Sequence, residues 1–331
     1  MANFIQRPDW LIPERFITPE TVLFQRRSFL KRLGLAGAGM MSLPLIGCGK
    51  EEAPKAVEAA AATTPAATAG PGKKYPAPRN PEFNPGWRFT DEKTAGTYNN
   101  FYEFSLVKDK VRTLVNKLVT APWPIEITGL VEKPMTIDAQ ELVDSMTLEE
   151  RVYRFRCVEA WAMIVPWTGF PFAKLIEKVS PKASARFVRF ETFNRPDQAP
   201  GMTRHSEYPW PYFEGLRIDE AMHPLTMVAT GIYGKPLPKQ HGAPIRMVVP
   251  WKYGYKSIKS IVKIEFVSQQ PTTFWETLAP EEYPFESNVN PAVPHPRWSQ
   301  ATEQMIDTGD RVRTKPYNGY GDLVAKLYAK A

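Results

Sequence analysis

Cysteine and histidine are scarce in this chain, which has only Cys48, Cys157 and four histidines in 331 residues. The histidines form no His-Glu-x-x-His segment and no closely spaced pair, so a structural zinc site is not expected. The sequence also has no Gly-x-Ser-x-Gly elbow, no glycine fingerprint of dinucleotide-binding folds and no internal repeat. These absences exclude several common classes of hydrolase, dehydrogenase and repeat protein.

Concentrated positive charge is absent from most of the chain. The formal net charge is +7, but residues 1–50 carry seven Lys and Arg against three Asp and Glu, which is more than half of it. Acids and bases are interspersed in the remainder, and no basic run with interleaved aromatic residues occurs. A nucleic-acid partner is therefore not expected.

The N-terminal region has the pattern of an export signal. Arg26 and Arg27 form a twin-arginine pair in "QRRSFLK", and an uncharged run follows from Leu33 to Gly47. This run of about 15 residues is shorter than the roughly 20 that span a bilayer, and it lacks the recurring polar face of an amphipathic helix. We therefore predict a signal peptide over residues 1–47 and export by the twin-arginine route, which carries folded proteins, often with a cofactor in place.

Two interpretations of the end of this signal stay open. "LIGC" resembles a lipobox, in which Cys48 becomes a lipidated first residue, whereas the small residues of "VEAAAA" suit ordinary signal peptidase and extend the signal to about residue 69. Residues 48–74 are rich in Ala, Thr and Pro and have too few large apolar residues to fold, so we predict a linker there. The folded domain is predicted to cover residues 75–331.

Strand signals dominate the predicted folded domain. Alternation in "RVYRFRC" places Tyr153, Phe155 and Cys157 on one face of a strand, and Arg154 and Arg156 on the other. Further strands are predicted in "PIEITG", "ARFVRFETF", "PIRMVVPW" and "SIKSIVKIEFVS", and helices in "TIDAQELVDSM" and "FPFAKLIEKVSP". The Pro-, Asn- and Gly-rich residues 75–100 are predicted to be extended. The expected fold class is α+β, strand-dominated, with long irregular connections.

Cys157 has no disulfide partner if Cys48 is modified or removed during export. A lone cysteine is most often a small buried apolar residue. An unpaired thiol in an oxidising compartment is a liability unless it is buried or bound, and a thiolate bound to a soft metal is the alternative interpretation. Glu159 lies two residues further on, and it is on the same face as Cys157 if the strand continues. We interpret it either as a proton relay or substrate-orienting group, or as a salt-bridge partner of Arg154 or Arg156.

Two other stretches have the composition of ligand-binding loops. "NNFYEF" (residues 99–104) combines hydrogen-bond donors with aromatic rings, and residues 239–261 combine His241, Arg246 and four lysines with several turns. Basic side chains and backbone N–H groups in such loops hold phosphate groups. Taken singly, each stretch is also compatible with a solvated loop.

The order of "NNFYEF", "YRFRCVEAW", "ETF", "HGAPIR" and "PWKYGYKSIKSI" resembles the sulfite-oxidase-fold molybdenum enzymes. Within that superfamily the chain is similar to the periplasmic protein-methionine-sulfoxide reductase catalytic subunits, from the twin-arginine signal to near the C-terminus. The resemblance implies that residues 75–331 bind a molybdenum–molybdopterin cofactor. Cys157 would then supply a thiolate to molybdenum, beside the two sulfurs of the pterin dithiolene. The other implied cofactor contacts are Asn99, Tyr102, Glu103, Thr192, His241, Arg246, Ser257, Ile258 and Lys259.

One position departs from the family pattern, because His241 stands where the family usually has Asn. The exchange keeps a hydrogen-bond donor but adds a group that can titrate. The wider superfamily often has His in the same setting, so a cofactor contact is still expected here.

The resemblance implies oxygen-atom transfer, in which the sulfoxide of an oxidised methionine residue loses its oxygen, and two electrons and two protons yield water. It implies a monomeric catalytic subunit in the periplasm that acts on oxidised periplasmic proteins. Electrons are expected from the quinone pool through a separate membrane haem-b subunit, because the sequence shows neither a transmembrane helix nor a haem motif.

Two alternatives remain at this stage. One is a sulfite-oxidase-like enzyme that acts on a small sulfur oxyanion, and the other is a tethered, non-enzymatic binding lipoprotein. The sequence after "SIVKIEFVSQQ" is too short for the dimerisation domain of sulfite oxidases, which favours the reductase.

Overall fold

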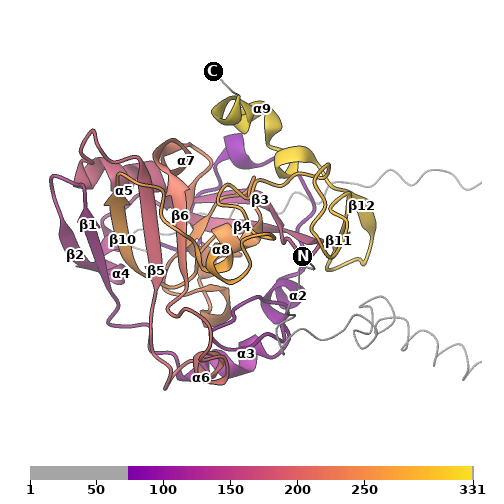
Figure 1. The fold of residues 1–331 in the computed structure, drawn as a ribbon, viewed down its shortest axis with the longest axis horizontal. Helices are drawn as coiled ribbons and strands as arrows, with labels where there is room; N and C mark the ends of the chain where they lie inside the picture. The colour runs from indigo at the N-terminus through magenta and orange to yellow at the C-terminus, as the bar shows by residue number, and fades with distance from the viewer. Residues whose placement is uncertain (1–73, 330–331) are drawn as a thin grey trace, which may run out of the picture. The chain divides into compact units, whose positions relative to one another are not determined.

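The computed structural model describes residues 74–329, which are built around two β-sheets (Figure 1). The predicted signal peptide, Cys48 and the predicted linker before Lys74 lie outside the described residues, so the boundaries of these segments stay predictions.

The first sheet has five strands in the order β2-β1-β10-β5-β6 and lies on the left of Figure 1. Neighbouring strands are antiparallel except β1 and β10, which are parallel. Ile125 and Ile127 are buried on one face of β1, so the alternation predicted in "PIEITG" is confirmed. The strands are β1 (Pro124–Gly129), β2 (Met135–Asp138), β5 (Phe187–Thr192), β6 (Phe213–Arg217) and β10 (Ile261–Val267).

The second sheet has seven strands, and the long strand β4 organises it. β4 pairs with β11 at its beginning, with β3 along most of its length and with β7 at its end. Every residue of β4 but Pro171 is buried, because both faces of the strand are covered. The strands are β3 (Glu149–Arg156), β4 (Trp161–Pro171), β7 (Met227–Ile232), β8 (Lys235–Pro236), β9 (Arg246–Val248), β11 (Thr302–Met305) and β12 (Arg311–Arg313).

The hairpin of β3 and β4 corrects part of the sequence prediction. β3 ends at Arg156, so Cys157 is the first residue of the turn rather than the last residue of the strand. The strand is buried on both faces, and Arg154 and Arg156 lie inside the protein, where they share the carboxylate of Glu303. The predicted alternation of side chains is therefore correct, but the face of β3 that carries Arg154 and Arg156 is buried and not exposed to solvent.

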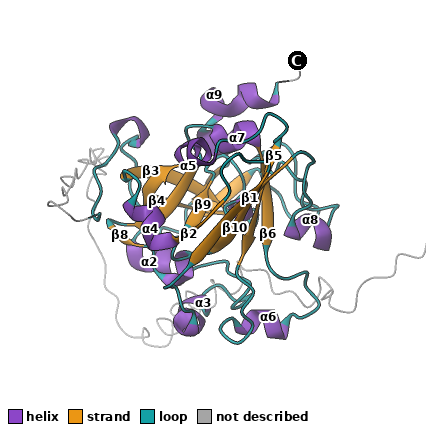
Figure 2. Cartoon of the chain, turned by 90° about the vertical axis from the view of Figure 1, so that its left-hand side faces the viewer, coloured by secondary structure: helices purple, strands orange, loops and turns teal. Residues whose placement is uncertain are grey.

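The helices are short and lie around the sheets (Figure 2). The helix predicted in "FPFAKLIEKVSP" is α5, with Pro171 at its N-cap and Ser180 in the left-handed conformation at its C-cap. The α-helices are α2 (Glu92–Thr97), α3 (Val111–Leu114), α4 (Ala139–Asp144), α5 (Phe172–Val179), α6 (Pro200–Arg204), α7 (Ile218–Met222), α8 (Phe274–Leu278) and α9 (Gly321–Val324). The 3₁₀ helices are η2 (Pro81–Phe83), η3 (Val115–Lys117), η4 (Lys239–His241), η5 (Gly254–Lys256), η6 (Pro316–Gly319) and η7 (Ala325–Tyr328).

Four local predictions differ from the structure. In "PIRMVVPW" only Arg246–Val248 form a strand. The first residues of "TIDAQELVDSM" belong to β2, and helix α4 begins only after Asp138, whose carboxylate caps it by accepting the N–H of Gln140. Helix α2 lies within a stretch that was predicted to be extended. In "SIKSIVKIEFVS" only Ile261–Val267 form a strand, and residues 257–260 form a loop before it. The α+β, strand-dominated fold class is confirmed.

None of the helices in residues 74–329 combines the length and the apolar character that a membrane crossing requires.

Candidate active site

The turn between β3 and β4 brings a thiol and a carboxylate together. The Cys157 N–H donates to the Trp161 carbonyl at 2.9 Å, and the Ala160 N–H donates to the Cys157 carbonyl at 3.2 Å. Ala160 takes a left-handed φ of 62°, which is sparsely populated for a residue other than glycine and lets the chain reverse tightly. The Glu159 N–H therefore points at Cys157 Sγ, 3.4 Å away. We expected Glu159 on the face of Cys157 if the strand continued, and the turn produces this proximity instead.

Asn100 contacts both groups of this pair. Its Nδ2 lies 3.3 Å from Cys157 Sγ and 3.3 Å from Glu159 Oε2, so the amide can donate to either. Its Oδ1 is buried and has no hydrogen-bond partner among the described residues. The sequence prediction named the neighbouring Asn99, whose Nδ2 donates instead to the carbonyl of Gly96 at 3.1 Å. Both asparagines stand in the "NNFYEF" stretch, so the sequence located the segment but not this contact.

The environment of the thiol opposes its ionisation. Burial raises the pKa of Cys157 far above its ordinary value, and the neighbouring Glu159 carboxylate raises it further. A thiolate at this position therefore needs an added positive charge close to Sγ, which a bound metal ion supplies. An uncharged thiol at neutral pH is the state that the protein alone favours.

Glu159 is paired with Lys108 rather than with an arginine. Lys108 Nζ lies 3.0 Å from Glu159 Oε2 and 3.1 Å from Oε1, and the two side chains are 17% and 31% exposed. The alternative that Glu159 is a salt-bridge partner of Arg154 or Arg156 is wrong, because these arginines bind Glu303 behind the turn. The carboxylate is thus oriented beside the thiol at a place that water reaches.

Two buried cations lie close to this turn. Arg246, at the start of β9, donates to the His241 carbonyl and to the Ser257 carbonyl, each at 3.0 Å. Lys259 donates to the carbonyls of Asn100 at 2.6 Å and Gln240 at 3.3 Å. Within residues 74–329 neither cation forms a salt bridge, although the charge of Glu103 acts on Lys259 from a greater distance. Backbone carbonyls therefore compensate these charges only in part, which leaves an environment that suits an anionic group.

Burial has a strong effect on both cations. It lowers the pKa of Arg246 to about 9, and burial together with the charge of Arg246 lowers the pKa of Lys259 well below its ordinary value. Gly242, with a φ of 98°, lets the backbone approach Lys259, because a Cβ there would lie 2.7 Å from the lysine side chain. The "HGAPIR" and "KSIKSI" stretches are thus folded against each other around the two cations.

His241 is buried beside these cations. Burial, Lys259 and Arg246 all lower its pKa far below the ordinary value of 6.5, so its imidazole is neutral at pH 7. Its ring packs edge to face against Trp167, with ring centroids 6.2 Å apart. A neutral imidazole offers one donor and one acceptor, as an asparagine amide does. The titration that the His-for-Asn exchange adds therefore lies below neutral pH.

The structure places the other predicted contacts in the same region. Glu103 is buried, which raises its pKa to about 7, although the charge of Lys259 opposes this. The Thr192 hydroxyl donates to the Ser260 carbonyl at 2.9 Å, and Ser257 Oγ accepts the Val249 N–H at 3.0 Å. Ile258, in the same loop as Ser257 and Ser260, is buried.

A row of aromatic rings beside the thiol was missed by sequence reasoning. Tyr102 contacts Trp275 (centroids 5.0 Å apart), and Trp275 contacts Tyr283 (5.2 Å). The row continues through His295 to Trp298, whose Nε1 donates to the carbonyl of Val158 in the turn. Burial raises the pKa of both Tyr102 and Tyr283, and the charge of the Glu159 carboxylate raises it further. Only Tyr102 lies in a stretch that the sequence had marked.

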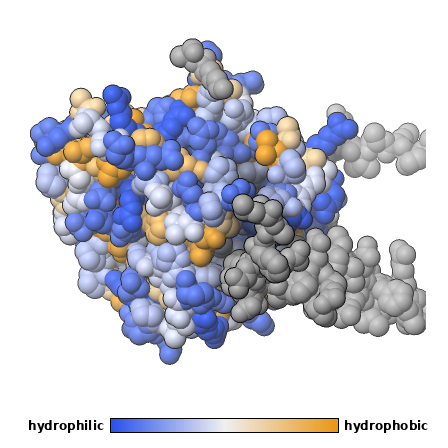
Figure 3. Space-filling view, in the orientation of Figure 1, coloured by the Kyte–Doolittle hydropathy of each residue, from blue (hydrophilic) through white to orange (hydrophobic). Residues whose placement is uncertain are grey.

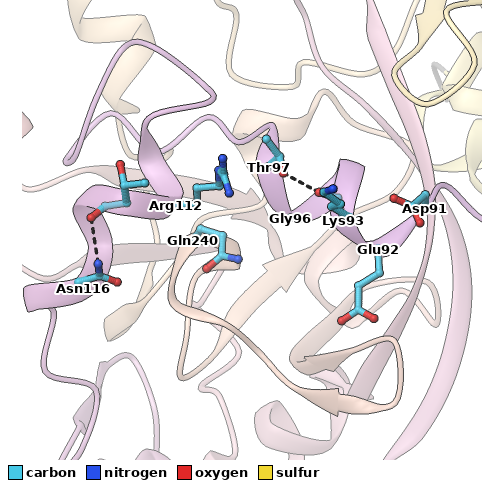
Figure 4. Close-up of a pocket in the computed structure, with 9 residues that line it drawn as sticks. Asp91, Glu92, Lys93, Gly96, Thr97, Arg112, Asn116 and Gln240 are labelled. Atoms are coloured by element: carbon cyan, nitrogen blue, oxygen red, sulfur yellow. Dashed lines mark hydrogen bonds between the residues drawn. The ribbon is translucent and has the colours of Figure 1, made fainter.

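A separate open pocket of about 610 Å³ lies outside this group of residues (Figure 4). It contains none of the predicted site residues, but a side chain at Gly96 would reach Gln240 Nε2 and His241 Nε2. The pocket therefore lies against η4 and does not open at Cys157. Its lining residues are Asp91, Glu92, Lys93, Gly96, Thr97, Arg112, Thr113, Asn116 and Gln240.

Comparison with known proteins shows which family the chain belongs to. A family model described as "Oxidoreductase molybdopterin binding domain" matches residues 112–275. The protein-methionine-sulfoxide reductase catalytic subunit MsrP of Burkholderia mallei is 48% identical over 321 residues, which cover 96% of this chain and 93% of the relative. MsrP of Xanthomonas axonopodis pv. citri is 45% identical over 328 residues, 96% of this chain and 95% of the relative. The chain belongs to the MsrP family.

Membership of the MsrP family confirms the predicted resemblance, the molybdopterin-binding fold and the molybdenum–molybdopterin cofactor. Among solved structures, the sulfane dehydrogenase SoxCD from Paracoccus pantotrophus aligns with 60% of this chain and 46% of its own, at a TM-score of 0.41 and 18% identity. The matched domain includes Cys157, Arg246 and Lys259 but not Asn100, Lys108 or the aromatic residues after 275. The roles of the individual site residues stay predictions.

Proposed function

We propose that this MsrP-family chain reduces methionine sulfoxide residues in oxidised proteins, with Cys157 as the thiolate ligand of a molybdenum–molybdopterin cofactor. One observation carries the proposal: a single buried thiol lies beside an oriented carboxylate and near two buried cations, Arg246 and Lys259, that form no salt bridge in the described part of the chain. Relatives at 45–48% identity over nearly the whole chain are named as protein-methionine-sulfoxide reductases.

The residues present fit such a cofactor. A thiolate is a soft ligand that suits molybdenum, and Arg246 and Lys259 would hold the anionic phosphate of the pterin. The unpartnered Oδ1 of Asn100 marks a buried polar position that the protein itself does not satisfy. When bound, the cofactor supplies oxygen-atom transfer, with two electrons and two protons balancing the release of water.

The protein side chains would position the substrate and provide a proton. Glu159, held by Lys108 and Asn100, is in reach of the Cys157 sulfur and of solvent, so it can hold a proton at its carboxylate. Trp275 and the neighbouring rings offer an apolar wall, because thioether sulfur makes favourable contacts with aromatic edges.

The twin arginines and the following uncharged run support export of the folded chain to the periplasm by the twin-arginine route. The substrates would then be oxidised periplasmic proteins, whose methionine residues are a common target of oxidation. A membrane haem-b subunit linked to the quinone pool would deliver the electrons to a monomeric catalytic subunit. Cys48 either anchors the exported chain through a lipid or is removed with the signal.

The test uses protein purified from a host that makes the cofactor. We expect stoichiometric molybdenum and reduction of an oxidised, methionine-rich protein by an artificial one-electron donor. The control is the same methionine-rich substrate protein without prior oxidation, to which the enzyme should transfer no electrons. Absence of molybdenum would contradict the proposal, and oxidation of sulfite without any sulfoxide reduction would favour the sulfite-oxidase-like alternative.

A further inference from the structure

The described residues in view in Figure 3 form a mostly hydrophilic face, with apolar residues in small separate groups. A more specific feature lies at the catalytic turn, where one backbone carbonyl accepts two side-chain donors. Trp298 Nε1 donates to the Val158 carbonyl at 2.8 Å, and Gln300 Nε2 donates to the same oxygen at 2.7 Å. The backbone bonds of the turn already close it, and one donor would satisfy a buried carbonyl, so the second donor needs another explanation.

The Val158 carbonyl belongs to the same peptide unit as the Glu159 N–H. This peptide bond is trans and therefore planar, so its C=O and its N–H point in opposite directions. The N–H points at Cys157 Sγ, 3.4 Å away. Donors that fix the carbonyl oxygen therefore also fix the direction of the N–H and keep it on the sulfur.

The hydrogen bonds on the two sides of this peptide run in series. The Trp298 and Gln300 donors bind its oxygen, and its N–H in turn donates to the sulfur of Cys157. Hydrogen bonds in such a chain polarise one another, so the donors at the oxygen make the N–H a stronger donor. An N–H directed at a thiolate stabilises its negative charge.

Trp298 is held in place by its own neighbours. Its ring stacks on the ring of His295, with centroids 3.8 Å apart and an angle of 6° between the planes, and the guanidinium of Arg297 lies 4.9 Å from its ring centroid. Both neighbours lie against Glu282, whose Oε2 is 3.3 Å from His295 Nε2 and 2.7 Å from Arg297. The indole N–H is therefore presented to the turn by a fixed ring.

We propose that Trp298 and Gln300 are positioning residues that hold the N–H of Glu159 on the Cys157 sulfur, and that this hydrogen bond raises the reduction potential of the molybdenum bound there. A hydrogen bond to a metal-bound thiolate withdraws negative charge from the sulfur, which favours the reduced state of the metal. The inference rests on the proposed function, because Cys157 must be the ligand. It deepens that function by assigning control of the metal to two residues beyond the matched domain, which ends at residue 275.

The first test is a redox titration of the molybdenum in the purified holoenzyme, followed by electron paramagnetic resonance. Trp298→Phe removes the indole N–H but keeps an aromatic ring against His295 and Arg297. The equilibrium constant for one-electron reduction should fall about two- to fivefold, which corresponds to a potential about 20–40 mV lower. Trp210→Phe is the matched control, because Trp210 Nε1 also donates to a backbone carbonyl, that of His205 at 2.7 Å, and it should leave the potential unchanged.

The second test measures amide hydrogen exchange of the Glu159 N–H by mass spectrometry on the same samples, and it needs no bound metal. Exchange should be about three- to tenfold faster in W298F than in wild type, and unchanged in W210F. Faster exchange in W298F would support the positioning role even in protein that holds no molybdenum, in which case the proposed function alone fails.

Two results would overturn the inference. Unchanged exchange in W298F would show that Trp298 does not hold the peptide, whatever the metal content. A potential that is unchanged or higher in W298F with molybdenum bound, or that W210F lowers equally, would show that this hydrogen bond does not control the metal.

Discussion

Replacing Glu303 by Gln removes the negative charge that Arg154 and Arg156 share behind the catalytic turn. Glu303 and Arg156 are fully buried, and Arg156 Nε donates to Glu303 Oε2 at 2.9 Å. Arg156 also donates to the carbonyl of Cys157, so this cluster holds the turn that presents the thiol. The substitution keeps the size of the side chain and one oxygen acceptor, but it leaves two buried guanidinium groups without a counter-charge.

The expected cost is large because the charges cannot regain water. Removing one partner of a buried ion pair costs about 3–5 kcal/mol, and the remaining amide oxygen favours the lower value of about 3 kcal/mol. For a folded region of this size, the melting temperature would fall by about 6–12 °C. Because the turn is less well held, activity should fall even at temperatures where the variant is folded.

Thermal and denaturant unfolding of wild type and E303Q measure the effect, with Glu265→Gln as the matched control. Glu265 pairs with Arg189 at 3.6 Å, and the two side chains are 30% and 26% exposed. Loss of such a pair costs at most about 1 kcal/mol. If E303Q is no less stable than E265Q, the buried cluster is not what holds the turn, and the reasoning is refuted.

Three further substitutions test the site. Glu159→Gln should lower kcat by about 10²-fold at unchanged molybdenum content if the carboxylate handles a proton, whereas an unchanged kcat would show a purely structural role. When the pH falls from 6.5 to 5.5, the free energy of unfolding should decrease by about 1 kcal/mol less in His241→Asn than in wild type. The reason is that burial holds the folded pKa of His241 well below 6.5, so the unfolded chain gains a proton first as pH falls; equal pH profiles would contradict this. Trp275→Ala should raise KM for a methionine sulfoxide peptide about two- to tenfold, and an effect confined to kcat would argue against the aromatic wall.

Much of the fold and of the site could be predicted from local sequence patterns, because these patterns depend on residues that are close together in the sequence. The alternation in "RVYRFRC" separated Cys157 from the arginines, and the loop compositions marked the segments that bring Arg246 and Lys259 together. The sequence could not show that the face with Arg154 and Arg156 is also buried, because a strand with one exposed face and a strand buried on both faces show the same alternation.

The remaining contacts depend on distant segments. Lys108 lies 51 positions from Glu159 in the sequence, and Glu303 lies 147 positions from Arg156. Nothing near the turn in the sequence therefore indicates either partner. The choice of Asn100 over Asn99 is set by the backbone of one loop, and the aromatic row joins residues from Tyr102 to Trp298. Such contacts follow from the tertiary arrangement rather than from composition or spacing.

The central claim is that Cys157 binds molybdenum through its sulfur. X-ray absorption at the molybdenum edge counts the sulfur neighbours of the metal in wild type and in Cys157→Ser, loaded with cofactor under the same conditions. The account predicts that the variant loses one sulfur neighbour and its sulfoxide reductase activity. An unchanged sulfur count in a variant that still holds molybdenum would contradict it and would make Cys157 a packed core thiol.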